Sequence, residues 1–118
     1  MTLSLDWIAG FFDGEGHVSI GMQRHFKNGK LYGRKNIILG QSGPDGLEIL
    51  KQIQLQCGGQ LYHHLKPGEH KATKDAYKLY WKAEEGKKFL EQIIPHLKLK
   101  QKAALEVLDY IRRNDAAK

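Results

Sequence analysis

The chain has 118 residues, with 19 Lys and Arg against 13 Asp and Glu, so its formal net charge at pH 7 is +6. This length fits one domain, residues 1–118, with a modest core. A sequence pI of about 9.4 favours a nucleic-acid partner, although a charge that only keeps a protein soluble would look the same. The single cysteine, Cys57, excludes a disulfide framework within the chain and fits a reducing compartment, and no apolar run reaches the length of a membrane span.

The first expected element is a helix that begins near Ser4 and ends at Asp13 or Gly14. Its apolar stripe toward the core consists of Leu5, Ile8 and Phe12. Gly10 and Gly14 lie four residues apart and therefore share another face of the helix. The side chains that flank this face are those of Trp7 and Phe11. Because the face carries little side-chain bulk, the backbone of a second helix can approach it closely.

Glu15 follows at the point where the helix runs out, next to unpaired main-chain carbonyls that carry partial negative charge. The helix dipole does not stabilise a carboxylate there, so a bound cation would explain its place. The run Asp13-Gly14-Glu15 also fits an ordinary turn that ends a helix. A calcium loop is excluded, because Arg24 stands where such a loop needs its closing glutamate.

Two strands joined by a tight turn are expected next. Residues 17–27 alternate with a period of two, which predicts a strand whose buried face is formed by Val18, Ile20 and Met22. The dipeptide Asn28-Gly29 favours a hairpin, and the second strand is expected from about Leu31 to Gln41. The outward positions of this second strand are Tyr32, Arg34 and Asn36, and the apolar run 37–39 leaves open whether Ile38 joins them.

A loop from Ser42 to Gly46 is expected to lead into a second helix that ends at Gly58-Gly59. Alternating patterns then predict strands near 60–66 and 76–82, separated by a polar loop. Two more helices are expected at about 83–94, before Pro95, and at about 98–113. The residues expected to face the core from this half of the chain are Leu47, Leu50, Ile53, Cys57, Leu61, His63, Leu65, Tyr77, Leu79, Trp81, Phe89, Leu90, Ile93, Ala104, Leu105, Leu108 and Ile111.

The element order is therefore α-β-β-α-β-β-α-α, which predicts an α+β fold with four strands and all helices on one face of the sheet. The other face would carry polar and basic side chains. Those expected to contact DNA are Ser19, Gln23, His25, Lys27, Lys30, Tyr32, Arg34, Gln60, Tyr62, His64, Lys66 and Lys78. Lys, Arg and Gln can contact guanine, adenine and phosphate from a β-ribbon in the major groove, although a solvated sheet face would also be polar.

RNA binding by base stacking is less favoured by the pattern. The outward tyrosines Tyr32, Tyr62 and Tyr80 are isolated in the sequence, and no RNA-recognition signature is present. A zinc site is excluded by the spacing of the six histidines and by the single cysteine.

The segment from Trp7 to Gly16 resembles the LAGLIDADG motif of homing endonucleases. Residues 8–16 match this motif apolar for apolar, small for small and acid for acid, and both motif glycines are kept. The resemblance covers almost the whole chain and includes the basic stretch 97–102. It implies an antiparallel, saddle-shaped sheet laid along DNA, with the motif helix at a dimer axis.

The resemblance also implies an active site. In the family, the acid at the position of Glu15 binds the catalytic metal, and the carbonyl of Gly14 could add a second oxygen. Gln41 and Lys100 match the family's glutamine and lysine near the reactive water, with Ser42 and Lys98 as their alternatives. Carboxylate oxygen is the ligand that Mg²⁺ prefers. Mn²⁺ is expected to replace it, and Ca²⁺ to permit binding without cleavage.

One motif supplies one acid, and cutting both DNA strands requires two, so the resemblance implies a homodimer. The residues expected at its interface are Trp7, Ala9, Gly10, Phe11, Asp13 and Gly14. Asp13 is expected to cap and pack there rather than bind metal. The symmetry of a dimer predicts a near-palindromic DNA target, and the family implies 3′ overhangs in the product.

The expected function is therefore that of a site-specific, metal-dependent DNA endonuclease acting on double-stranded DNA, with no membrane partner. Two alternatives keep the fold, namely an intron RNA maturase and a DNA-binding regulator that does not cut. A basic interaction module without a nucleic-acid role is a third. The sequence shows no targeting segment, which favours an intracellular protein encoded by a bacterium, a phage or an organelle.

Overall fold

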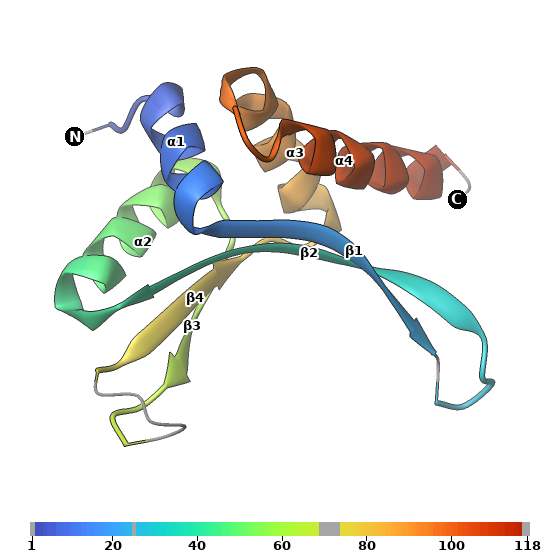
Figure 1. The fold of residues 1–118 in the computed structure, drawn as a ribbon, viewed down its shortest axis with the longest axis horizontal. Helices are drawn as coiled ribbons and strands as arrows, with labels where there is room; N and C mark the ends of the chain where they lie inside the picture. Colours follow the sequence, from blue (N-terminus) through green and yellow to red (C-terminus); the bar gives the residue numbers. More distant parts are fainter. Residues whose placement is uncertain (1, 25, 69–73, 117–118) are drawn as a thin grey trace.

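A computed structural model describes residues 2–24, 26–68 and 74–116. Figure 1 shows one arched sheet with the helices on its convex side and two hairpins descending on the other. The elements in chain order are α1 (Leu5–Glu15), β1 (Gly16–Arg24), β2 (Leu31–Ser42), α2 (Gly43–Cys57), β3 (Gln60–Leu65), β4 (Ala76–Tyr80), α3 (Ala83–Ile93), the short 3₁₀ helix η2 (Ile94–His96) and α4 (Gln101–Ala116). None of the helices in the described ranges is long and apolar enough to span a bilayer.

The four strands are all antiparallel and lie in the order β1-β2-β4-β3. The predicted α+β class, the antiparallel sheet and the single helical layer are therefore confirmed. The sheet joins two sequential hairpins through β2 and β4, which pair from Ile38↔Tyr80 to Ser42↔Ala76. This central pairing brings the two halves of the chain together.

Helix α1 begins as predicted, with the hydroxyl of Ser4 accepting a hydrogen bond from the Trp7 N–H at 3.1 Å. Ile8 and Phe12 are fully buried, and the Phe12 ring meets that of Phe89 edge to face at 5.6 Å. The helix continues through Glu15, slightly beyond its predicted end, and β1 follows without a loop.

Gly16 makes this direct helix-to-strand junction possible. A Cβ at this position would lie 2.7 Å from the carbonyl oxygen of Phe12, and still closer to its ring. A backbone atom cannot move aside cheaply, so the junction requires a residue without a side chain. The acid of the motif is thereby fixed at the last helical position before the sheet.

The first hairpin confirms the prediction at Asn28-Gly29. Gly29 has a φ of 70°, and the Lys30 N–H donates to the Asn28 side chain at 2.9 Å. The buried position predicted for Met22 is wrong, because this side chain is 63% exposed. The end of the hairpin reaches beyond the helical layer (Figure 1), and the Met22 side chain lies largely in solvent.

Helix α2 starts at Gly43, and the loop predicted from Ser42 to Gly46 is therefore wrong. Pro44 lies in the first turn, where its missing N–H leaves no hydrogen bond unmade. Leu50 and Ile53 are fully buried as predicted. The helix ends at Gly58, whose φ is 75°.

The second hairpin departs from the predicted burial at His63. His63 was expected to face the core, yet it is exposed, stacks on the Tyr77 ring at 4.9 Å and places Nε2 2.8 Å from Asp75 Oδ1. The regular register pairs His63 with Tyr77, so His63 keeps its predicted phase although it is not buried. The pairing shifts only after it, between His63 and Leu65.

Helices α3 and α4 close the core over the sheet. The Trp81 ring stacks on Phe89 at 3.9 Å, and its Nε1 donates to the carbonyl of Cys57 at 3.1 Å. Leu105, predicted to be in the core, is 48% exposed, whereas Val107 is buried. Val107 lies on the same helical stripe as the buried residues Ala104, Leu108 and Ile111, and Leu105 falls outside that stripe.

Candidate active site and nucleic-acid interface

The two acids at the end of α1, Asp13 and Glu15, lie in different environments. Asp13 is buried, and its carboxylate accepts hydrogen bonds from the main-chain N–H groups of Lys98, Leu99 and Lys100 at 2.6, 3.1 and 2.9 Å. Burial by itself would raise the pKa of this carboxyl, but these three N–H donors and the nearby Lys100 ammonium together hold the pKa below its usual value. Asp13 is therefore charged at neutral pH.

This use of Asp13 corrects the predicted start of the last helix. The segment 98–100, which Asp13 holds, is not helical, so α4 begins at Gln101 rather than near Lys98. The Asp13 carboxylate is also engaged within its own chain, and Ala9 is fully buried there. Their placement at a dimer interface stays a prediction, which would have to rest on the backbone of α1 rather than on these two side chains.

Glu15, in contrast, is exposed and lines a hollow of about 410 Å³ at the edge of the sheet, hereafter the acidic hollow. None of the residues that the structure describes hydrogen-bonds to its side chain. Residues from α1, β2, β3 and β4 line this hollow, namely Glu15, Gly40, Gln41, Ser42, His64, Ala76, Tyr77 and Lys78. A carboxylate thus lies next to a cation and several polar side chains, accessible to a ligand.

Both Gln41 and its alternative Ser42 line the acidic hollow, so the structure brings the two of them to Glu15. Gln41 is the more confined, because a Cβ at Gly46 in the first turn of α2 would lie 2.8 Å from the Gln41 Cβ. This contact limits the positions open to the Gln41 side chain. Ser42 is exposed and makes no capping hydrogen bond to α2.

Of the two candidate lysines, Lys100 has a fixed side chain and Lys98 an exposed one. The Lys100 ammonium donates to the carbonyl oxygen of Asp13 at the end of α1, where the helix dipole is negative. The Lys98 side chain is exposed, and only its main-chain N–H meets Asp13. Lys100 does not line the acidic hollow, but it is fixed to the last turn of the helix that carries Glu15.

His64 and Lys78 were predicted only as DNA contacts, yet they share the acidic hollow with Glu15. Their place depends on strand register, since Gly40 pairs with Lys78 and Gln41 with Tyr77. No signal within a single strand reports this pairing, and sequence reasoning had no means to find it.

The acidic hollow offers a hard cation one carboxylate among its lining residues. Within the described ranges, no three His, Cys, Asp or Glu side chains gather as metal ligands. Glu15 is the acid among the residues that line the acidic hollow, and Gly14 precedes it in the chain. Mg²⁺ is commonly held by one or two carboxylates, with water and substrate phosphates completing its shell. Burial raises the pKa of the Cys57 thiol, so it stays protonated at neutral pH.

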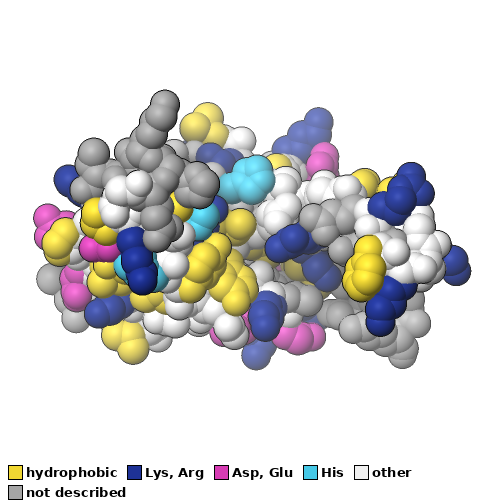
Figure 2. All heavy atoms as spheres, turned by 90° about the horizontal axis from the view of Figure 1, so that it is seen from below, with side chains coloured by type: hydrophobic (Ala, Val, Ile, Leu, Met, Phe, Trp, Pro, Cys, Tyr) yellow, Lys and Arg dark blue, Asp and Glu magenta, His cyan; other side chains and the backbone are white. Residues whose placement is uncertain are grey.

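The outward face of the sheet contains no acid in any strand. Figure 2 shows this face from below, with basic, histidine and hydrophobic side chains interspersed over it. Cross-strand pairing places on it the predicted contacts Ser19, Arg34, Gln60, Tyr62 and Lys78. Lys27 and Lys30 lie in the turn of the first hairpin and Lys66 directly follows β3. His25 lies outside the described residues, as do the side chains of Gln23 and Tyr32.

Two of the three tyrosines predicted to be isolated, Tyr62 and Tyr80, contact each other. The rings of Tyr62 and Tyr80 lie 5.4 Å apart at an angle of 72°, and Tyr62 also meets His64 at 6.1 Å. The three residues come from two paired strands, so their contact becomes visible only in the sheet.

Neither a protein-family model nor a curated protein matches this chain in sequence. Many solved structures match it in shape. I-TnaI, a homing endonuclease, aligns over 99% of this chain and 77% of its own, with a TM-score of 0.77 and 24% identity. The LAGLIDADG meganuclease I-CpaMI, solved bound to uncleaved DNA, aligns over 97% of this chain with a TM-score of 0.75 and 21% identity.

The chain has the fold of a LAGLIDADG homing endonuclease. The homing endonuclease I-CvuI, solved with DNA and either Mg or Ca, has a TM-score of 0.72 and 24% identity over 92% of this chain. This chain spans 65% of the length of I-CvuI and 38% of that of I-CpaMI.

In this LAGLIDADG fold, α1 is the helix that carries the motif. Its Gly10 and Gly14 are exposed, and no described atom lies within 4 Å of the position that a Cβ would take on either. The Trp7 and Phe11 rings stack at 5.2 Å beside them, and Trp7 is 43% exposed. The face is therefore open, narrow and bordered by aromatic surface.

Proposed function

We propose that this chain is a site-specific endonuclease that cuts double-stranded DNA as a homodimer with a divalent metal. The observation that carries the proposal is the position of Glu15, an exposed carboxylate in a hollow at the edge of a basic sheet face whose four strands contain no acid. A carboxylate there repels a phosphate backbone unless a cation lies between them. A protein that only binds DNA has no use for it.

In this proposal, the residues in and near the acidic hollow have different catalytic roles. Glu15, with the Gly14 carbonyl, would hold Mg²⁺ or Mn²⁺, which when bound acidifies water and neutralises charge on the phosphate. Gln41, which lines the hollow close to Gly46, would orient the attacking water through its amide. Lys78 lies in the same hollow and Lys100 at the end of α1, and both add positive charge near the phosphodiester.

We infer a homodimer because cleavage of both DNA strands requires two active sites. Each chain offers one such acid, and two opposed phosphodiesters need two. The open face of Gly10 and Gly14 would let two α1 helices pack closely, which brings two acidic hollows together about a two-fold axis. We expect a near-palindromic target, 3′ overhangs, and binding without cleavage in Ca²⁺.

A cleavage selection tests the proposal. The protein is incubated with a partly palindromic, randomised duplex library in Mg²⁺, and cut ends are sequenced. We expect a symmetric consensus cut on both strands, lost in Glu15→Gln and kept in Glu48→Gln, which changes an exposed acid on α2. Specific binding to duplex DNA without cut ends in Mg²⁺ or Mn²⁺ would support a non-cleaving regulator on the same fold.

The intron RNA maturase remains a competing proposal, and one observation favours it. The exposed Tyr62 and the half-buried Tyr80 beside it offer aromatic surface on which unpaired bases could stack. A maturase would bind its intron RNA more tightly than duplex DNA. Parallel binding titrations with both nucleic acids at one salt concentration separate the two functions.

A further inference from the structure

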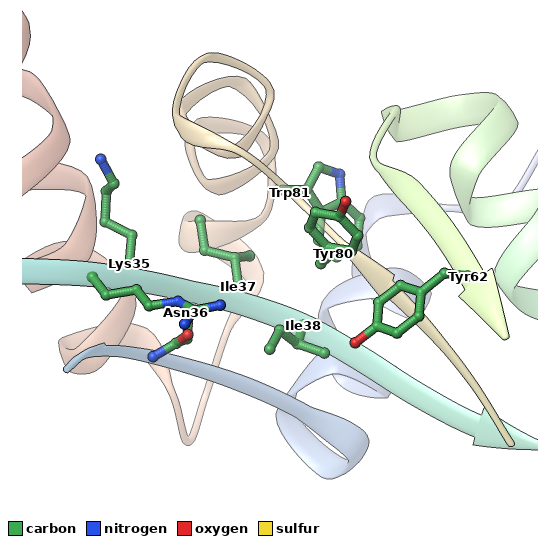
Figure 3. A pocket seen from close by; sticks show the side chains of 8 residues that line it. Lys35, Asn36, Ile37, Ile38, Tyr62, Tyr80 and Trp81 are labelled. Atoms are coloured by element: carbon green, nitrogen blue, oxygen red, sulfur yellow. The ribbon is translucent and has the colours of Figure 1, made fainter. Parts of the chain in front are cut away.

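A second hollow, of about 400 Å³, lies near the centre of the sheet, where β2 and β4 separate (Figure 3). Strand β4 ends at Tyr80, and the Trp81 N–H donates to the carbonyl of Ile37 at 3.0 Å before the chain turns into α3. Strand β2 continues with β1 alone, so the sheet forks. The residues that line this hollow, hereafter the aromatic hollow, are Arg34, Lys35, Asn36, Ile37, Ile38, Tyr62, Tyr80 and Trp81.

Its outward side is apolar. Ile38 and Tyr80 are cross-strand partners, and Tyr62 joins them from β3 with 41% of its surface exposed. In Figure 3, Lys35 and Ile37 rise on the helical side of β2, whereas Asn36 and Ile38 lie on the opposite side. Exposed apolar surface in the middle of a basic face points to a ligand that carries an apolar group there.

The charges around the hollow favour a polyanion as that ligand. Arg34 lines it, and Lys78 is the cross-strand partner of Tyr62. No acidic residue occurs in the four strands that surround it. Charge complementarity therefore favours a nucleic acid whose exposed edge presents a small apolar group between phosphates.

Asn36 adds an oriented polar group at the same place. Its Nδ2 donates to Ser19 Oγ at 3.3 Å, and Ser19 Oγ in turn lies 2.9 Å from His17 Nε2. An asparagine amide has two N–H donors and one carbonyl acceptor, so one N–H and the carbonyl are not used in this bond. This donor and acceptor match N7 and N6 of adenine in the major groove.

We propose that the aromatic hollow receives a thymine 5-methyl group in the major groove, with Asn36 directed at an adenine beside it. The methyl group is the apolar feature that distinguishes thymine from the other bases in that groove. This proposal rests on the proposed DNA-binding function and adds a base preference to it, namely A·T pairs near the middle of each half-site.

The experiment uses the full chain and binding rather than cutting. A consensus duplex is first selected by binding in Ca²⁺, and each thymine is then replaced singly by deoxyuridine, which removes only the methyl group. We expect binding to weaken by about 3- to 10-fold at one or two positions per half-site, in line with the burial of one methyl group. All other thymines should tolerate the exchange.

Two variants assign the effect to this hollow. Tyr62→Ala changes an exposed side chain and should abolish the difference between thymine and deoxyuridine at those positions. Lys66→Ala, a cation of the same hairpin, should weaken binding to both duplexes equally and preserve the difference. Circular dichroism and thermal melting confirm that each variant is folded.

The outcomes separate this proposal from the proposed function. Tight, salt-dependent binding to duplex DNA that no deoxyuridine exchange weakens would overturn the thymine assignment and leave the DNA-binding function intact. The thymine assignment also fails if Tyr62→Ala retains the full methyl dependence. If wild type binds single-stranded RNA through Tyr62 and does not bind duplex DNA, both proposals fail.

Discussion

The acidic hollow and the aromatic hollow lie on the same sheet and each have a volume of about 400 Å³. They differ in the side chains that line them. The acidic hollow combines one carboxylate with polar and basic side chains at the end of a helix. The aromatic hollow places apolar rings and Ile38 at a fork between strands. A phosphodiester needs charge and water at one fixed point, whereas a base edge needs a matching shape.

The two hollows also differ in how they are supported. The acidic end of α1 is anchored from behind by Asp13 and Lys100, which tie the helix to the segment before α4. The aromatic hollow depends on the pairing of β3 with β4 and on partly exposed rings. Changes in the first should therefore alter the rate of cutting, and changes in the second should alter the choice of sequence.

The largest expected effect separates these roles directly. We expect Glu15→Gln to lower the single-turnover cleavage rate by about 10³-fold or more and to change DNA affinity by less than about threefold. Tyr62→Ala should have the opposite effect. It should weaken DNA affinity, while the cleavage rate at saturating DNA stays that of wild type. Rapid-quench cleavage and equilibrium binding on the same duplex measure both quantities. Equal losses of rate in both variants would remove the distinction between the hollows.

The support of the acidic hollow is tested by Asp13→Asn. The amide has one acceptor oxygen in place of the two that meet three N–H donors, so we expect unfolding free energy to fall by about 2 kcal/mol. Denaturant unfolding at neutral pH measures this loss. A variant as stable as wild type would show that the Asp13 contacts do not hold the end of α1.

The pH dependence of the same variant follows from the lowered pKa of Asp13. The folded-state pKa lies below the ordinary value of 3.8, so the carboxylate stabilises the fold fully above that value. This stabilisation is lost as the pH falls through the folded-state pKa. The difference in stability between wild type and Asp13→Asn should therefore narrow below pH 3.8, as acid titration of both proteins would measure.

Two glycine substitutions compare the packing beside Gln41 in the acidic hollow with the packing of β2 against Tyr110. A Cβ at Gly46 would lie 2.8 Å from the Gln41 Cβ and 3.4 Å from its main-chain carbon, so we expect Gly46→Ala to displace Gln41. Stability should fall by about 1–2 kcal/mol and cleavage should slow. At Gly33, on β2, the nearest atom would be the Tyr110 hydroxyl, which can swing away. Gly33→Ala should therefore cost less than about 1 kcal/mol and preserve the cleavage rate, as unfolding and kinetic measurements would show.

The smallest expected effect concerns the helical face that should unite two acidic hollows. Since nothing described lies near a Cβ at Gly10, Gly10→Ala should stabilise the single chain by about 0.5–1 kcal/mol through helix propensity. The same methyl group should weaken a close dimer. Sedimentation at several concentrations, together with thermal melting, measures both changes. A gain in stability without loss of dimer would place the interface elsewhere.

The sequence alone determined the features that depend on a few neighbouring residues. Ser4 marks the start of α1, Asn28-Gly29 makes the first turn, and period-two patterns define four strands. These signals are local because helix periodicity, capping and tight turns are properties of short stretches of backbone. The resemblance of the α1 motif then led to the correct fold.

Only the tertiary structure decided which side chains meet. It turned Asp13 inward and Glu15 outward, exposed Leu105 and buried Val107, and brought Tyr62 and Tyr80 into contact. The register of β2 on β4 placed Lys78 in the hollow of Glu15. Strand register and helix packing are set by contacts between distant segments, and the pattern within any one segment is the same for several registers.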